Sequence, residues 1–309
     1  MNITSLVAEQ VFIMLVLILI GFAFTKKGLI TKAGTKDISA ILLTIVTPCV
    51  LIKAYQIDYS SEIVRELLMS FVLSILIHIV FIVLSYILCR YEKNSEKRIS
   101  IIFTCAYSNC GFMGIPLLAA TLGDKGVLLG SAYLATFNVL VWTHGYCMYG
   151  RSIKYLSLKN LIKNPGVIGV CLALVLFFTR IRIQGPLKDI VGYCASLNTP
   201  LAMFLLGTYL ARNNFKKAVA ESGIYIVTII KLIVFPLIAV FLFCLIGTDS
   251  FLATTLVLSA ACPAAAISPI FAEKFDIDTG YPSQIVSVTT LISILTIPLV
   301  SYAASFLIR

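Results

Sequence analysis

Charged side chains are scarce in this sequence. Lysine, arginine, aspartate and glutamate together make up 12% of its 309 residues, whereas 60% are hydrophobic and the mean hydropathy is +1.01. A soluble globular domain carries about 25% charged residues. A chain of this length could not hide so much apolar surface from water. The composition therefore excludes a soluble fold and makes the lipid bilayer the solvent for most of the chain.

The sequence also lacks the marks of several other classes of protein. Its nine cysteines fall in apolar stretches without CxxC spacing or paired histidines, so we expect no metal site, no cofactor and no disulfide. HExxH and Gly-x-Ser-x-Gly motifs are absent, which argues against an intramembrane enzyme and leaves no catalytic residue to assign. The formal net charge of +10 comes from short loops between apolar runs, so it indicates membrane topology rather than nucleic-acid binding.

Apolar runs long enough to cross a bilayer recur along the chain. A transmembrane helix needs about 20 apolar residues, and this criterion predicts ten spans with no linker long enough for a soluble domain. The predicted spans are residues 5–25, 37–56, 67–89, 99–122, 126–148, 165–179, 187–211, 223–246, 251–272 and 282–307. The first span has no basic residue before it, unlike a secretory signal, so we expect it to remain as a helix.

Basic residues are distributed unequally between the two sides of the membrane. With ten spans the loops alternate, so that one side receives sixteen lysines and arginines and the other receives six. Cytoplasmic loops are rich in lysine and arginine. We therefore expect a multi-pass protein of a bacterial inner membrane with both termini outside the cytoplasm.

The two halves of the sequence match each other at an offset of 152 residues. Lys-Asp-Ile at 36–38 aligns with the same tripeptide at 188–190, and Thr-Pro at 47–48 aligns with Thr-Pro at 199–200. Both copies begin the second helix of their half. Because five helices is an odd number, the second half would enter the membrane from the opposite side.

The predicted fold class is thus an all-α polytopic membrane protein. Its ten transmembrane helices form two inverted five-helix repeats, at residues 1–150 and 151–309. Inverted repeats of this kind are common in secondary transporters.

The fourth and ninth predicted spans carry helix-breaking residues at corresponding places. These are Gly111, Gly114 and Pro116 in the fourth span, and Pro263 and Pro269 in the ninth. Proline inside a helix costs about 3 kcal/mol, and in lipid such a break persists only when it is buried in protein or faces a wet cavity. Two interrupted helices at matching places predict a substrate site near the membrane midplane. The alternative, for each single proline, is a kink that serves packing only.

A broken helix offers specific chemistry to a ligand. The amino end of a half-helix presents unpaired N–H groups and a partial positive charge, which suit a carboxylate. Asn109 adds a donor and an acceptor beside the first break, and Ser268 adds a hydroxyl beside the second. We expect these residues to bind a small organic anion.

The same residues resemble a family signature. The stretch Asn109-x-Gly111-Phe112-x-Gly114-Ile115-Pro116-Leu117 resembles the fourth-helix signature of the auxin efflux carrier family, which includes plant PIN carriers and bacterial malate and malonate permeases. The segment 263–273 resembles the matching segment of the second half. The likeness covers nearly the whole chain, and the missing long central loop makes it similar to the short bacterial members.

This resemblance implies a fold shared with bile-acid symporters and sodium/proton antiporters. Helices 1, 2, 6 and 7 would form a scaffold that also builds a homodimer, and helices 3 to 5 and 8 to 10 would form a transport domain that moves as an elevator. Helices 4 and 9 would cross at their broken centres. The substrate-binding residues implied are Asn109, Pro116, Pro263 and Pro269 at this crossing, and Thr47, Pro48, Asn198, Thr199 and Pro200 on the facing scaffold helices.

Two titratable residues inside the spans are candidates for charge or proton coupling. Lys231 lies inside the eighth span, where it either joins a polar patch or extends its long stem to the nearer interface. Its repeat-related position lies beside His78, a residue type that changes charge near neutral pH. For His78 the alternative is a hydrogen-bonded packing role.

Secondary transport is the function that these features predict. The substrate would be a mono- or dicarboxylate of the malate, malonate or auxin kind, moved by alternating access and driven by the membrane potential, a proton gradient or a sodium gradient. The alternatives are a membrane sensor that binds its ligand without moving it, and a cation- or proton-coupled symporter of the bile-acid type.

Overall fold

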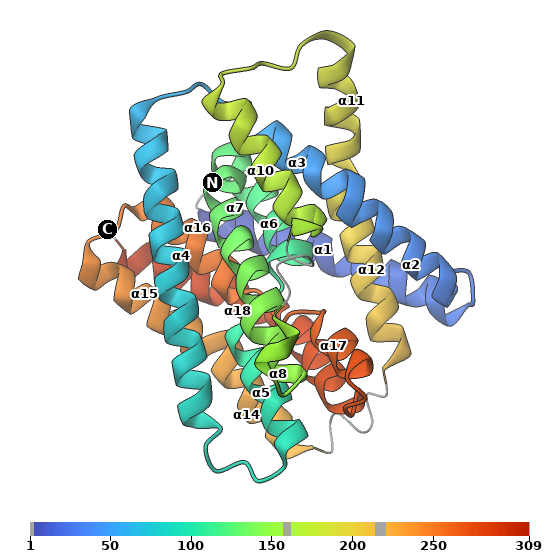
Figure 1. Cartoon of the computed structure of the whole chain (residues 1–309). Coiled ribbons are helices and arrows are strands. Elements are labelled where there is room, and N and C mark those ends of the chain that lie inside the picture. Colours follow the sequence, from blue (N-terminus) through green and yellow to red (C-terminus); the bar gives the residue numbers. More distant parts are fainter. Residues whose placement is uncertain (1–2, 157–161, 214–220, 309) are drawn as a thin grey trace.

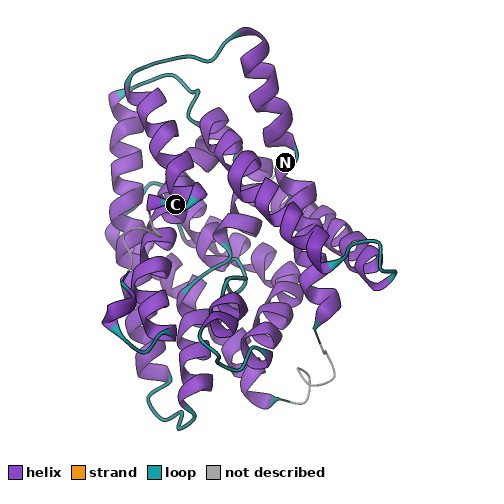
Figure 2. Cartoon of the chain, turned by 45° about the vertical axis from the view of Figure 1, so that its right-hand side comes forward, coloured by secondary structure: helices purple, strands orange, loops and turns teal. Residues whose placement is uncertain are grey.

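The computed structural model describes residues 3–156, 162–213 and 221–308, and regular structure in these residues is helical (Figure 1 and Figure 2). Seven helical stretches in the described residues are long and apolar enough to cross a membrane. They are α1 (Ile3–Lys26), α2 to α3 (Lys32–Ala54), α4 (Ser61–Leu88), α7 to α8 (Gly123–Tyr149), α11 to α12 (Gly185–Arg212), α14 to α15 (Ser222–Ile246) and α18 (Gly280–Leu307).

Shorter helices lie between these long ones. Three of them are apolar, namely Cys110–Thr121, α10 (Pro165–Phe178) and α16 (Ser250–Ala261), and α5 (Ser95–Ala106) and α17 (Ser268–Lys274) flank them. A helix thus lies in each predicted range, but the fourth, sixth and ninth are short or divided. The count of ten spans and the inverted repeat therefore remain predictions, whereas a polytopic helical membrane protein is what the structure supports.

Several long helices contain one wide, π-helical turn that divides them into the segments labelled in Figure 1. Three such turns end two residues before a proline: η1 (Leu42–Val46) before Pro48, η2 (Cys110–Gly114) before Pro116, and η5 (Ile230–Val234) before Pro236. Proline has no N–H to donate, and its ring clashes with the carbonyl one turn earlier. A wide turn relieves that clash, so each of these helices continues through its proline.

The turns delimit the remaining segments. These are α2 (Lys32–Ile41), α3 (Thr47–Ala54), α6 (Ile115–Thr121), α7 (Gly123–Leu140), η3 (Val141–Gly145), α8 (Tyr146–Tyr149), α14 (Ser222–Ile229) and α15 (Phe235–Ile246). Leu197 separates α11 (Gly185–Ser196) from α12 (Asn198–Arg212).

Helices α1 and α12 approach to backbone contact, and two glycines permit it. A Cβ atom added at Gly207 would lie 2.2 Å from the carbonyl oxygen of Ile18, and one added at Gly21 would lie 2.5 Å from that of Phe204. Small residues let membrane helices approach to backbone contact. Around this pair, α3 packs on α10 and α11, α4 packs on α7, and α16 packs on α7 and α18.

Both helices that were predicted to be broken are interrupted, and the two breaks touch. Helix α5 ends at Ala106, and residues 107–109 separate it from η2 and α6, so this break lies just before Gly111 rather than at Pro116. Helix α16 ends at Ala261, and six residues separate it from α17. The amide of Asn109 donates to the carbonyl of Pro263 (2.7 Å), and the amide of Ala265 donates to that of Tyr107 (3.0 Å). We call this paired region, residues 107–109 and 262–267, the crossover.

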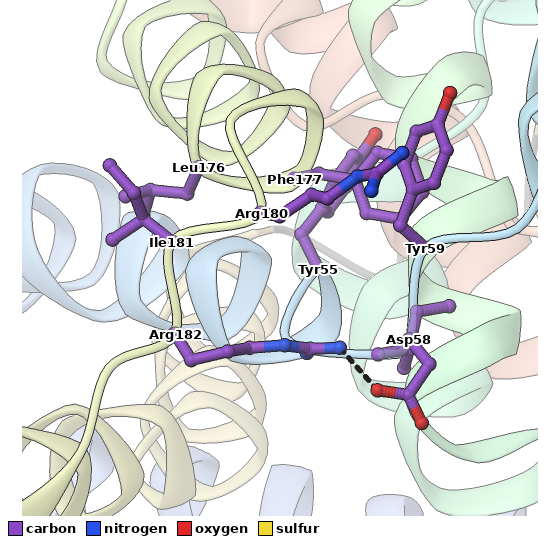
Figure 3. A pocket seen from close by; sticks show the side chains of 9 residues that line it. Tyr55, Asp58, Tyr59, Leu176, Phe177, Arg180, Ile181 and Arg182 are labelled. Atoms are coloured by element: carbon purple, nitrogen blue, oxygen red, sulfur yellow. Dashed lines mark hydrogen bonds and ion pairs between the residues drawn. The ribbon is translucent and has the colours of Figure 1, made fainter.

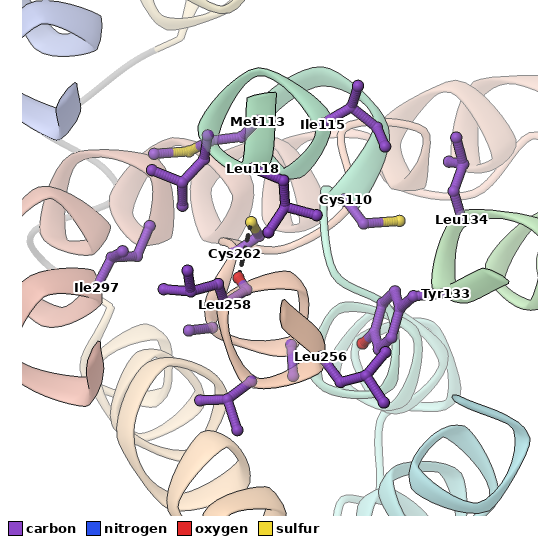
Figure 4. Close-up of a cluster of buried hydrophobic side chains, with 14 of the residues drawn as sticks. Cys110, Met113, Ile115, Leu118, Tyr133, Leu134, Leu256, Leu258, Cys262 and Ile297 are labelled. Atoms are coloured by element: carbon purple, nitrogen blue, oxygen red, sulfur yellow. Dashed lines mark hydrogen bonds between the residues drawn. The ribbon is translucent and has the colours of Figure 1, made fainter. Parts of the chain in front are cut away.

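The crossover is enclosed by protein, as broken backbone in a membrane must be. Figure 4 shows side chains of α6 and α16 meeting around Cys262, with Ile297 of α18 on one side and Tyr133 of α7 on the other. These residues are all buried. The two amides that join the breaks, those of Asn109 and Ala265, are thus paired beside an apolar shell.

Candidate functional site

A cavity of about 360 Å³ lies beside the crossover. Its walls come from four places: the crossover with α17, the α2 to α3 helix, the α7 to η3 helix, and the start of α10 with Tyr209 of α12. We call it the crossover cavity. Pockets for small molecules usually measure about 300–1,000 Å³, so this cavity has room for one small ligand.

Hydrogen-bond donors of the first break line the crossover cavity. The side-chain amide of Asn109 is buried and has no hydrogen-bond partner among the described residues. Gly111 and Phe112 follow it in the first turn of η2, where a helix provides no acceptors for its own amides. The backbone of Asn109 is meanwhile fixed, because its amide is bonded to Pro263 and its carbonyl accepts from Met113 and Gly114. The unpartnered side-chain nitrogen of Asn109, on a fixed backbone at the start of a helix, suits an anion.

Apolar and aromatic side chains form most of the remaining wall. Phe112, Phe137, Trp142 and Tyr209 line the crossover cavity together with smaller apolar residues. The indole Nε1 of Trp142 is buried and has no partner in the described part of the chain. The wall therefore suits a ligand with an apolar body and a small number of polar atoms.

Among the described residues that line the crossover cavity, two are charged and both are cations. Lys163 precedes α10 and Lys274 ends α17, and none of the described lining residues is acidic. The Nζ atom of Lys274 lies 4.9 Å from the ring centroid of Tyr146. The local field therefore favours an anionic ligand over a cationic one.

Lys231 lies outside the crossover cavity but against the crossover. Its side chain is fully buried in η5, and its Nζ donates to the hydroxyl of Ser108 (2.6 Å), the residue before Asn109. Nζ also lies 5.9 Å from the ring centroid of Phe81. No described acidic side chain forms an ion pair with it. The sequence left two alternatives for Lys231. The structure shows it in an interior polar patch and not extended to the membrane interface.

His78 belongs to the same patch. Its Nδ1 lies 2.7 Å from the carbonyl oxygen of Ser74, and its ring centroid lies 4.4 Å from that of Tyr133. The hydroxyl of Tyr133 in turn lies 3.4 Å from that of Ser108. His78 Nε2 is buried without a partner in the described residues. The structure thus connects both titratable candidates to the crossover through Ser108, and their role in coupling stays a prediction.

The structure brings together three of the substrate-site residues predicted from the sequence and separates the others from the crossover cavity. Asn109, Gly111 and Thr47 line it, and the Thr47 hydroxyl donates to the carbonyl of Leu42 (2.8 Å) in the adjacent wide turn. The remaining predicted residues are not among its walls: Gly114, Pro116, Pro263, Ser268, Pro269, Pro48, Asn198, Thr199 and Pro200.

Three of these nine residues have contacts or positions that can be described. Ser268 is buried and shares a 2.7 Å hydrogen bond with the Tyr149 hydroxyl. Gly114 packs against the second break, since a Cβ atom added there would lie 3.4 Å from the sulfur of Cys262. The side-chain amide of Asn198 is buried and unpartnered among the described residues, but it lies at the start of α12.

Sequence reasoning missed Asn138, Trp142, Tyr209, Lys163 and Lys274 as residues of the crossover cavity. Trp142 offered a signal, because it is the single tryptophan of the chain. The two lysines were interpreted only as topology charges. Asn138 and Tyr209 carried no local signal, since only tertiary packing brings α7 and α12 to the crossover.

Comparison with known proteins adds a family. The sequence profile of the membrane transport protein family matches residues 6–159 and 150–301. An uncharacterized transporter of Methanocaldococcus jannaschii is 25% identical over 302 residues, which cover 94% of this chain and 96% of that protein. An uncharacterized transporter of Methanothermobacter thermautotrophicus is 22% identical over 300 residues, again 94% of this chain and 96% of that protein.

Proposed function

The chain belongs to the membrane transport protein family, also called the auxin efflux carrier family, and from that premise we propose that it carries a small organic anion by alternating access. It is a multi-pass membrane transporter, as its relatives are named. The observation that carries the proposal is the crossover cavity, where the unpartnered side-chain nitrogen of Asn109, beside a broken helix, lies with an apolar wall and two lysines.

The shape of this cavity favours one class of substrate. The donors gather at one point, at Asn109 and the first turn of η2, whereas the aromatic wall of Phe137, Trp142 and Tyr209 is extended. A monocarboxylate with an apolar body would place its carboxylate at these donors and its apolar body against the aromatic wall. A second carboxylate would have to reach Lys163 or Lys274, which a short dicarboxylate does only if it spans the cavity.

The position of the cavity supports an alternating-access mechanism. It lies between the proposed scaffold, which comprises α1, α2 to α3, α10 and α11 to α12, and the proposed transport domain that contains the crossover. Lys163 and Lys274 belong to the loops that are predicted to be cytoplasmic. The structure then corresponds to a cytoplasm-facing state, and movement of the crossover along the scaffold carries the anion to the other side. Ten spans in two inverted repeats, a homodimeric scaffold and a bacterial inner membrane complete this proposal.

Lys231 gives this cycle a simple charge balance. It sits in the transport domain with no described acidic partner, so the empty domain carries one buried positive charge whenever Lys231 is protonated. A bound monocarboxylate would balance that charge, and the loaded domain would cross the membrane as a neutral unit. The membrane potential, worth about 2.3 kcal/mol per charge per 100 mV, would act on the return of the empty domain.

Counterflow of labelled acids in proteoliposomes tests the proposal. A panel of aliphatic and aromatic monocarboxylates and short dicarboxylates is offered to the reconstituted protein, first as wild type and then as Asn109→Asp and Asn109→Ala. Both variants lose the free donor, and Asn109→Asp also repels the anion. A hydrogen bond to a charged group contributes about 2 kcal/mol, so we expect Asn109→Ala to lower flux about thirtyfold and Asn109→Asp to abolish it.

Thr296→Val provides a matched control. Thr296 also has a buried side-chain atom without a described partner, but it lies outside the crossover cavity. We expect its flux to equal that of the wild type. Undiminished flux in both Asn109 variants would remove the site assignment, and saturable binding without any counterflow would show a sensor instead of a carrier.

A further inference from the structure

A second pocket lies away from the crossover cavity, where α3 and α10 end. Its volume is about 250 Å³. It is lined by the end of α10 and by the α3 to α4 and α10 to α11 connections, through Tyr55, Ile57, Asp58, Tyr59, Leu176, Phe177, Arg180, Ile181 and Arg182. Figure 1 shows the α10 to α11 loop and the start of α4 at one end of the molecule, opposite the α4 to α5 loop. We call it the boundary pocket, because both helices end there.

Two arginines extend into the boundary pocket from the α10 to α11 connection, Arg180 toward Tyr59 and Arg182 toward Asp58 (Figure 3). Arg182 is ion-paired with Asp58 at 2.7 Å, which leaves that pair without net charge. The guanidinium of Arg180 lies 4.4 Å from the ring centroid of Tyr59 and donates a hydrogen bond to no described protein atom. The boundary pocket therefore keeps one net positive charge with a full set of free donors.

The backbone of Arg180 adopts a left-handed conformation, which glycine occupies more often than other residues. Arg180 has φ +59°, and it closes the end of α10 through bonds from its own amide to Phe177 (3.1 Å) and from the Ile181 amide to Leu176 (3.0 Å). Glycine adopts this left-handed conformation freely, whereas another residue pays about 1 kcal/mol. A strained position occupied by arginine rather than glycine is a reason to look for a function of its side chain.

The surface next to the boundary pocket is apolar and exposed. Along α10 and its end, Leu172, Val175, Phe178 and Ile181 have exposed fractions of 46%, 56%, 50% and 54%. In a membrane transporter such side chains contact acyl chains. A ligand that fills the pocket and continues over this surface has an anionic head and an apolar tail.

We propose that the boundary pocket binds the headgroup of an anionic phospholipid. The phosphate accepts two parallel hydrogen bonds from Arg180, the geometry for which a guanidinium is suited. The acyl chains lie along the exposed face of α10. A zwitterionic lipid fits less well, because its cationic group would meet the charge of Arg180 while Asp58 is already paired with Arg182.

Lipid retention by the purified full-length protein tests this site. Native mass spectrometry in detergent measures binding of phosphatidylglycerol, phosphatidylcholine and inorganic phosphate to the wild type and to Arg180→Gly. Glycine suits the backbone of that position, so we expect the variant to fold as well as the wild type, with an unfolding temperature that is equal or higher. Phosphatidylglycerol affinity should fall about tenfold or more, as expected for loss of a charge-assisted hydrogen bond.

The chain provides a matched control in Arg151. It is also an arginine with positive φ (52°), but it lies outside the boundary pocket and is ion-paired with Glu96 at 3.5 Å. Arg151→Gly removes the same charge and relaxes the same kind of backbone, and it should retain phosphatidylglycerol like the wild type. Equal losses in both variants, or equal retention of phosphatidylcholine, would overturn the proposal. Binding of inorganic phosphate with the same dependence on Arg180 would also overturn it, because the site would then serve a soluble anion.

Discussion

The contact between α1 and α12 leads to the sharpest prediction about the fold, because no side-chain movement can relieve a clash there. In Gly207→Ala the added methyl group would lie 2.2 Å from the oxygen of Ile18, 2.7 Å from the nitrogen of Phe22 and 2.9 Å from the carbonyl carbon of Gly21. All three atoms belong to backbone. The two helices must therefore separate, and the packing along their whole contact weakens.

The expected loss is large for a single methyl group. Overpacking of a well-filled core costs about 1–3 kcal/mol when side chains can rearrange. Here they cannot, so we expect at least about 3 kcal/mol. A large domain loses roughly 3 °C in its unfolding temperature per kcal/mol, which predicts a fall of about 10 °C.

Thermal unfolding of the detergent-purified protein measures this effect, with Gly192→Ala as the matched control. A Cβ atom added at Gly192 in α11 meets nothing within 4 Å. Alanine is the better helix former by about 1 kcal/mol, so this control should be neutral or slightly stabilising. If Gly207→Ala unfolds at the same temperature as Gly192→Ala, the inferred backbone contact between α1 and α12 is wrong.

Two further predictions concern buried polar groups. Lys231→Met removes a fully buried charge without a described acidic partner, so the unfolding temperature should stay equal or rise. Anion counterflow should fall at least tenfold. Wild-type flux in this variant would exclude a role of Lys231 in the charge balance. Ser268→Ala leaves the buried Tyr149 hydroxyl without its 2.7 Å partner, which should cost about 1–3 kcal/mol in unfolding measurements. Counterflow by the Ser268→Ala protein that remains folded should be normal, and a complete loss would place Ser268 in the substrate site.

The parts of the fold that could be predicted from the sequence are those with local signals. Apolar runs of bilayer length identified the long helices, and Pro263 marked the place where one of them breaks. The other helix breaks at residues 107–109, just before Gly111, and continues through Pro116. A proline or glycine acts on its own backbone, so its effect can be inferred without knowledge of the fold. The position of Asn109 beside a break followed for the same reason.

Other features depend on packing that no local pattern encodes. The sequence placed Lys231 inside a helix but could not identify Ser108 as its partner, because the two residues are 123 positions apart. Repeat matching treated Thr47 and Thr199 as equivalent, yet only Thr47 lines the crossover cavity. The repeat relates Thr47 to Thr199 along the sequence. The crossover cavity lies on one side of the crossover, so residues that the repeat relates need not both line it.

A structure with bound substrate tests the central claim most directly. The carboxylic acid selected by the counterflow panel would be added to the wild-type protein, and its density located by electron cryomicroscopy. The account predicts a carboxylate within hydrogen-bonding distance of the Asn109 side-chain amide and the amides of Gly111 and Phe112, with its apolar body against Trp142. Substrate density elsewhere, with the crossover cavity empty, would contradict it.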